Sequence, residues 1–328
     1  MADRIPVFCN LLDQGARELG LPLNEYYSRG EYVAEGQLRL QKKYGYDNVW
    51  CLFYVGKEAE LFGCRKIIFA EDGPPNVGEM ILETYDDVYR LQVPEDVTSH
   101  PAFEETRKCL DILKREVGGK RPICAYVTAS MTLPAILMGM ENWLALLLSG
   151  PLDVRDELLE KCSEFFRKQV AALRNAGADI ILYSNPFGSV DFLPMRMFEM
   201  LSLPWMERDL KPVGADGVVY YCGGARLIPV IDRVIERTGI GAYYLSPLES
   251  VAAGKRAIEG RALCAGVIND IRMIDWSPQE VREEVKRILA EGMPGGRFMF
   301  GTVVMPWSIP DANIRAMLEA AFEFGRLQ

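Results

Sequence analysis

The stretch Asp179-Ile-Ile-Leu-Tyr-Ser184 decides the fold when it is read together with the segment before it. Residues 179–184 form a short apolar run rich in residues that favour strands, as expected for a parallel strand buried on both faces. The preceding segment has helical periodicity, with apolar side chains on one stripe at Leu158, Cys162, Phe165, Val170 and Leu173. A helix followed by a buried strand is the repeating unit of an α/β fold.

The same unit recurs along the whole chain. Seven further strands are predicted at Ile5–Cys9, Val49–Val55, Pro122–Thr128, Val218–Cys222, Gly241–Leu245, Leu263–Ile268 and Arg297–Val304. Helical segments alternate with them; one begins at Pro278, with Ser277 as its N-cap. Eight such units predict an α/β fold of the (β/α)8 TIM-barrel type. Because no Ser/Gly-rich linker interrupts them, we expect a single domain over residues 1–328.

Two connections are longer than a barrel requires. Residues 11–47 and 56–120 separate the first three predicted strands. Connections of this length usually contain structure of their own. We therefore expect additional N-terminal helices or a hairpin over one mouth of the barrel.

Composition excludes several classes of function. The net charge of −9 argues against nucleic-acid binding, which needs clustered Lys and Arg. Eight cysteines without a CxxC pair favour a reducing compartment over a disulfide framework. The longest apolar segment, residues 131–148, is interrupted by Pro134 and Glu141, and no signal peptide is recognised at the start. A cytoplasmic protein that does not enter a membrane is expected.

The chain contains one histidine, His100. A zinc peptidase with two histidines is therefore excluded. His100 lies in a polar loop before a helical segment, so a surface or capping role is expected for it.

In a TIM barrel the active site lies at the carboxyl ends of the strands. The candidate positions there are Asn10, Tyr54, Thr128 with Ser130, Ser184 with Asn185, Tyr220 to Gly224, Ser246, Asn269 with Asp270, and Val303 to Met305. Amides, hydroxyls and aromatic rings dominate this set. Such a mouth is suited to a neutral or aromatic substrate held by hydrogen bonds and stacking.

Four residues near the mouth have alternative interpretations. Cys222 is either a metal ligand or nucleophile, or a buried strand cysteine. Glu199 either contributes to the site or lies on a solvated helix face. Tyr220 and Tyr221 alternate along a strand, so at most one of them points into the barrel.

Eight local motifs occur in the order typical of one known superfamily. They are Asp3-Arg-Ile-Pro-Val7, Tyr46-Asp47, Glu58-Ala-Glu-Leu-Phe-Gly63, Ala176-Gly-Ala-Asp179, Asn185-Pro-Phe-Gly-Ser189, Cys222-Gly223, Gly266-Val-Ile-Asn269 and Pro310-Asp-Ala-Asn313. With them the chain resembles the uroporphyrinogen decarboxylase superfamily, especially its cobalamin-dependent methyltransferase branch. The resemblance implies a barrel that docks a separate corrinoid protein and passes a methyl group between a small substrate and cobalt.

The sequence departs from this branch at the zinc ligands. Thiol-methylating members carry His-x-Cys and a later Cys, where this chain has Tyr220-Tyr221-Cys222 and Thr302-Val303. The ligand positions of ether-demethylating members correspond to Ser184, Glu199 and Tyr220. Three protein ligands are typical of catalytic zinc, and neither set is complete. The resemblance therefore implies a degenerate zinc site at Glu199, Tyr220 and Cys222, and zinc is doubtful.

The resemblance also assigns roles to individual residues. Tyr220, Glu199 and Cys222 are the candidate catalytic residues, with the Tyr220 hydroxyl as a proton donor that Glu199 orients. The candidate substrate-binding residues are Tyr54, Ser184, Asn185, Tyr221, Ser246 and Asn269.

The implied activity is methyl transfer between a small methyl donor, foremost an aromatic methyl ether, and a corrinoid protein. Cobalamin is expected on that partner, because this chain lacks the Asp-x-His-x-x-Gly signature. One alternative is a porphyrinogen decarboxylase, although residues 1–43 lack that enzyme's Met-Arg-Gln-Ala-Gly-Arg signature. The other is a metal-free barrel that binds a ligand without catalysis.

Overall fold

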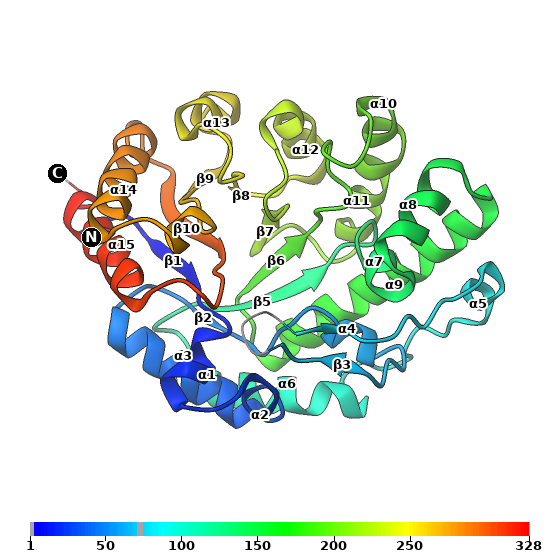
Figure 1. The fold of residues 1–328 in the computed structure, drawn as a ribbon. Helices are drawn as coiled ribbons and strands as arrows, with labels where there is room; N and C mark the ends of the chain where they lie inside the picture. The colour runs from blue at the N-terminus through cyan, green and yellow to red at the C-terminus, as the bar shows by residue number, and fades with distance from the viewer. Residues whose placement is uncertain (1–2, 71–74, 328) are drawn as a thin grey trace.

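Eight parallel strands form a nearly closed barrel in the computed structural model, which describes residues 3–70 and 75–327 (Figure 1). Hydrogen bonds connect them in the order β1-β10-β9-β8-β7-β6-β5-β2. The bounds are β1 (Val7–Asn10), β2 (Val49–Trp50), β5 (Ile123–Thr128), β6 (Ile180–Ser184), β7 (Val218–Tyr221), β8 (Ala242–Tyr244), β9 (Leu263–Val267) and β10 (Phe298–Val304). The predicted (β/α)8 barrel is confirmed, with each strand inside the range expected for it or within one residue of it.

The second strand is the one whose predicted length is wrong. The sequence predicts residues 49–55, but β2 ends at Trp50. The Cys51 N–H still donates to the Cys124 carbonyl at 2.8 Å. Beyond it the Lys57 N–H donates to the Tyr54 carbonyl, and this turn leads into the next helix.

Helices surround the strands (Figure 1). They are α1 (Gln14–Leu19), α2 (Leu23–Tyr26), α3 (Gly30–Tyr44), α4 (Lys57–Glu60), α5 (Tyr85–Arg90), α6 (Glu104–Val117), α7 (Leu133–Met138), α8 (Met140–Ser149), α9 (Leu152–Ala176), α10 (Met195–Met197), α11 (Leu203–Leu210), α12 (Ile231–Thr238), α13 (Val251–Ile258), α14 (Pro278–Gly292) and α15 (Asp311–Phe324). Single 3-10 turns lie at Pro101–Phe103, Ile228–Val230 and Arg272–Ile274, and a π-helical turn at Phe198–Ser202. The predicted start of α14 is confirmed, because Ser277 and Glu280 form a capping box.

The two long connections contain the expected additional structure. The first holds α1, α2 and α3, and the second holds α4, a hairpin of β3 (Ile67–Ile68) and β4 (Asn76–Val77), α5 and α6. In Figure 1, α5 projects beyond the outline of the barrel. In its 3-10 turn, His100 has the capping role expected for it, since its Nδ1 accepts from the Ala102 N–H at 3.1 Å.

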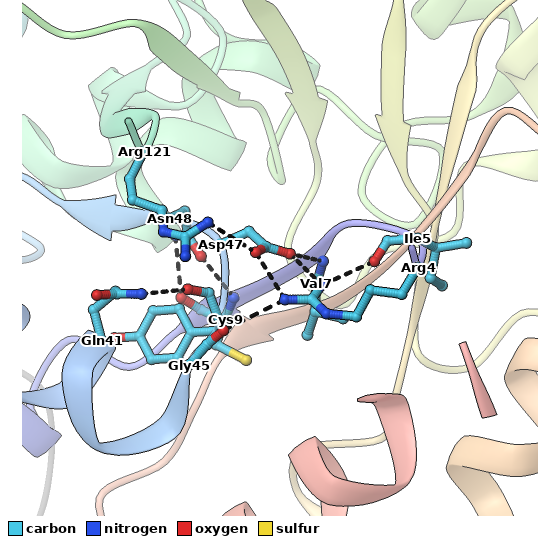
Figure 2. A network of polar contacts seen from close by, with 10 residues as sticks. Arg4, Ile5, Val7, Cys9, Gln41, Gly45, Asp47, Asn48 and Arg121 are labelled. Atoms are coloured by element: carbon cyan, nitrogen blue, oxygen red, sulfur yellow. Dashed lines mark hydrogen bonds and ion pairs between the residues drawn. The ribbon is translucent and has the colours of Figure 1, made fainter. Parts of the chain in front are cut away.

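Side chains replace a strand ladder between β1 and β2 (Figure 2). The Asn48 side chain accepts from the Cys9 N–H at 3.0 Å and donates to the Cys9 carbonyl at 3.3 Å. Asp47 accepts from the Val7 N–H at 2.8 Å and forms a two-pronged ion pair with Arg4. Together with one backbone hydrogen bond, from the Asp47 N–H to the Val7 carbonyl at 2.8 Å, these contacts close the barrel where no strand ladder forms.

The core has two layers, one inside the barrel and one between the strands and the helices. Alternation along each strand decides which side chain enters which layer. Within residues 3–70 and 75–327, no helix is long and apolar enough to cross a membrane.

Candidate functional site

A pocket of about 320 Å³ opens at the carboxyl ends of β1, β2, β9 and β10. Its volume is at the lower end of the range for small-molecule sites. The lining residues are Leu12, Asp13, Tyr27, Phe53, Tyr54, Val55, Pro75, Asp270, Ile271, Val304, Met305, Pro306 and Trp307. Tyr27 and Pro75 come from the two long connections, which therefore cover part of this mouth. We call this cavity the mouth pocket.

Four aromatic residues line the mouth pocket: Tyr27, Phe53, Tyr54 and Trp307. The rings of Tyr27 and Tyr54 meet edge to face, with centroids 5.2 Å apart. The Tyr54 hydroxyl donates to Glu60 at 2.9 Å, and this contact fixes the ring. Of the predicted substrate-binding residues, Tyr54 is the one that lines this pocket.

Two buried carboxyl groups also line the mouth pocket. Asp13 accepts from the Tyr27 hydroxyl at 2.5 Å, and burial raises its pKa above the ordinary value. Asp270 follows β9 and is 6% exposed. Among the described residues no side chain bonds to its carboxylate, and burial raises its pKa to about 6 despite nearby backbone N–H groups. Ionising both groups without a positive partner is therefore costly.

An aromatic cluster fills the barrel beneath the pocket. The ring of Tyr126 stacks on Trp50 at 4.9 Å and on Phe53 at 4.7 Å, and its edge meets Tyr221 at 5.4 Å. The Tyr221 hydroxyl accepts from the Val304 N–H at 3.4 Å, so Tyr221 lies directly below the pocket wall. Within the described ranges, the buried Tyr126 hydroxyl has no hydrogen-bond partner.

Tyr220 does not enter the barrel, which corrects its predicted role as a proton donor in the site. Val219 and Tyr221 face inward, so Tyr220 between them faces the helices. Its ring packs between those of Tyr183 and Tyr243, at centroid distances of 6.0 and 5.8 Å. The Asn185 side chain is its polar neighbour.

Glu199 lies on the outer surface, which corrects its predicted placement beside Tyr220. It belongs to the π-helical turn Phe198–Ser202, and its side chain is 44% exposed. Its carboxylate pairs with Arg233 of α12 at 2.8 Å. The solvated helix face that the sequence offered as the alternative is what the structure contains.

Cys222 is a buried thiol whose sulfur donates to the Ala225 carbonyl at 3.0 Å. Burial raises its pKa above the ordinary range, which favours the neutral thiol over a thiolate ligand. Together with an ion-paired Glu199 and an outward Tyr220, it does not make a donor set that fits zinc. Across residues 3–70 and 75–327, no three His, Cys, Asp or Glu side chains group as a metal site would require.

Four other predicted substrate-binding residues hold loops in place. Asn185 accepts from the Thr132 hydroxyl at 3.3 Å, and Ser246 donates to the Gly224 carbonyl at 2.6 Å. Asn269 accepts from the Arg272 N–H at 3.0 Å. Ser184 is half-buried at the end of β6, and its carbonyl accepts from the Ala129 N–H. None of the four is among the residues that line the mouth pocket.

Sequence reasoning missed Asp13, Tyr27 and Trp307. Asp13 and Tyr27 lie in the first long connection, and Trp307 follows the last strand by three residues. Asp270 is among the rim positions that the sequence predicts, although Asn269 beside it is the one predicted to bind substrate. Asp13 and Trp307 each lie three residues beyond the end of a strand, and this spacing is the sequence signal that identifies them.

The chain is similar to one protein family and to two characterised relatives. A family model described as uroporphyrinogen decarboxylase (URO-D) matches residues 1–324. A methylcobamide:CoM methyltransferase, MtbA of Methanosarcina mazei, is 22% identical over 97% of this chain and 93% of that protein. A uroporphyrinogen decarboxylase of Alkalilimnicola ehrlichii is 24% identical over 72% of this chain and 66% of that protein.

A solved structure shares the fold. It is a methyltransferase from Methanosarcina mazei with a TM-score of 0.85 and 19% sequence identity. The alignment covers 99% of this chain and 95% of that one.

Proposed function

The chain belongs to the uroporphyrinogen decarboxylase family, and from this premise we propose that it transfers a methyl group between a small substrate and the cobalt of a separate corrinoid protein. The observation that carries the proposal is the mouth pocket, which could hold a small methyl donor where a partner can reach it. Similarity to a methylcobamide:CoM methyltransferase over nearly the whole chain supports the same activity. Residues 1–328 would act as one catalytic domain.

The rim of the mouth offers a surface for the corrinoid partner. Large apolar side chains are exposed after four strands: Val55, Phe192, Leu248 and Ile271. Val55 and Ile271 also line the mouth pocket. Exposed apolar groups clustered around a concave site are typical of surfaces that bind another protein. A partner docked here would close the pocket and exclude water from it.

An aromatic methyl ether is the substrate class that the pocket walls support. The rings of Tyr27, Phe53, Tyr54 and Trp307 can stack on an aromatic donor and orient its methyl group. The corrinoid would supply the cobalt that accepts the methyl group. When the methyl–oxygen bond breaks, its electron pair stays on the ether oxygen, which then takes a proton from water or a nearby acid.

The pocket is poorly suited to a porphyrinogen decarboxylase. A porphyrinogen substrate carries several carboxylates, which need positive partners. The described lining residues include Asp13 and Asp270 but no Lys, Arg or His. Like charges facing the substrate would oppose its binding.

The test mixes the protein with cob(I)alamin, free or on a corrinoid carrier protein, and a panel of methyl ethers, methylated amines and methylated thiols. Methylation is followed by the change in cobalamin absorbance. Transfer from any donor, dependent on the protein, supports the proposed activity. Failure with every donor, both with free cobalamin and with the carrier, would contradict it and favour a barrel that only binds a ligand.

A further inference from the structure

The mouth pocket combines two features that recognise positive charge. Asp13 and Asp270 are both more than nine-tenths buried and line the pocket. Four aromatic residues share its walls, and the faces of aromatic rings attract cations. The described lining residues include no Lys, Arg or His that could neutralise the two carboxyl groups.

Two basic side chains stack on aromatic residues of the pocket, and both are engaged by other parts of the chain. Lys57 approaches the Tyr54 ring but pairs with Glu60 at 2.6 Å. Arg17 stacks on Trp307 and donates to the carbonyls of Trp307 and Ile309. Among the described residues, neither of these basic groups pairs with Asp13 or Asp270.

Asp270 is the side chain that a ligand would satisfy. It is 6% exposed, it lines the pocket, and no side chain of the described residues bonds to its carboxylate. Asp13 differs, because the Tyr27 hydroxyl already donates to it. Burial raises the pKa of both groups, as expected for carboxyl groups held without a cation nearby. A bound cation would offset the free-energy cost of ionising the buried Asp270 carboxyl group.

We infer that the mouth pocket selects small cationic substrates, with Asp270 as the principal counter-charge, and excludes anionic ones of the same shape. That the bound cation is a substrate rests on the proposed function. Its chemical class is an aromatic methyl ether that carries an ammonium group, or a methylated ammonium. The aromatic walls contact the apolar part of the substrate, and the faces of their rings attract its ammonium group. The Asp270 carboxylate pairs with the positive charge.

Binding of three probes of nearly equal shape tests the inference. They are 4-methoxybenzylammonium, 4-methoxybenzyl alcohol and 4-methoxybenzoate, each titrated calorimetrically into the full-length protein without a corrinoid. The ammonium probe should bind at least about tenfold more tightly than the alcohol, and the benzoate should bind most weakly. Equal affinities, or tightest binding of the benzoate, would overturn the inference.

Variants locate the effect. Asp270→Asn keeps the shape of the side chain, and should weaken binding of the ammonium probe by about tenfold or more while leaving the alcohol unchanged. Asp270→Glu should retain part of the preference. Asp216→Asn removes the same charge from an exposed site before β7 and should change nothing. Unaltered ammonium binding by a folded Asp270→Asn protein would contradict the assignment, and thermal unfolding checks the fold.

The two proposals can fail separately. The binding experiment contains no cobalamin, so its outcome does not depend on methyl transfer. If methyl transfer succeeds with neutral or anionic donors as readily as with cationic ones, the charge inference fails and the activity stands. If no donor reacts but the charge preference is measured, the activity fails and the pocket remains a site for cations.

Discussion

Tyr220 and Tyr221 are neighbours in the chain, yet their side chains lie in different layers of the molecule. Tyr221 contacts the aromatic cluster inside the barrel, and Tyr220 packs between the strands and the helices. We expect Tyr220→Phe to change the rate of cobalamin methylation by less than about twofold while costing about 1 kcal/mol of stability. Tyr221→Phe removes the acceptor of the Val304 N–H in the pocket wall, and this loosening of the wall should lower the rate by about threefold or more. The reverse order of the two rates would restore the proton-donor role of Tyr220.

Glu58 is a buried carboxyl whose titration should affect stability. It accepts from the Thr128 N–H at 3.0 Å, and burial raises its pKa from 4.5 to about 7. A raised pKa means that the folded state binds the proton more tightly than the unfolded chain does, so protonation of Glu58 stabilises the fold. This stabilisation is complete below pH 4.5 and is lost as the pH rises through 7.

The measurement compares the wild type with Glu58→Gln, which keeps the acceptor and removes the titration. Between pH 4.5 and pH 8 the wild type should lose roughly 3 kcal/mol of unfolding free energy relative to the variant. The exposed Glu25→Gln serves as the control and should show no such difference. Parallel pH profiles of wild type and Glu58→Gln would show that Glu58 does not titrate in this window.

At the scale of elements, the weakest join of the barrel is the one between β1 and β2, where no strand ladder forms. Asn48 serves both the N–H and the carbonyl of Cys9 there. Asn48→Ala should destabilise the fold by about 1–3 kcal/mol, because the buried Cys9 N–H loses its acceptor, whereas the Cys9 carbonyl still accepts from the Trp50 indole N–H at 2.6 Å. Urea unfolding measures the loss. Asn175→Ala, at an exposed position of α9, is the matched control, and equal losses in the two variants would refute the role of Asn48.

At the scale of the whole molecule, the proposed docking surface lies at the carboxyl end of the barrel. Leu248 and Ile271 are 73% and 61% exposed there, so replacing either with Glu should leave folding intact. We expect Leu248→Glu and Ile271→Glu to slow transfer involving a corrinoid carrier protein by about tenfold. With Leu248→Glu, transfer to free cobalamin should stay near the wild-type rate. Leu327→Glu, beside Asp3 near the start of β1, is the control. Equal rates for all variants with the carrier would place the docking surface elsewhere.

The barrel was predictable because each strand is a local pattern. A short apolar run after a helical stripe needs no knowledge of distant residues, and all eight runs became strands. The site was less predictable because it depends on how these patterns meet. Tyr54 was found from its place after a strand, whereas Asp13 and Tyr27 reach the pocket through a long connection whose path no local pattern determines.

The sequence by itself determined the number of barrel strands and their order along the chain, and the family. It also determined that polar residues gather at the carboxyl ends of the strands. Only the tertiary structure decided that Tyr220 faces the helices, that Glu199 pairs with Arg233, and that Asp270 lines the pocket. The physical reason is that periodicity fixes which residues share a face, but not which face turns inward. Which face turns inward, and which groups surround each carboxylate, depend on packing between segments far apart in the chain.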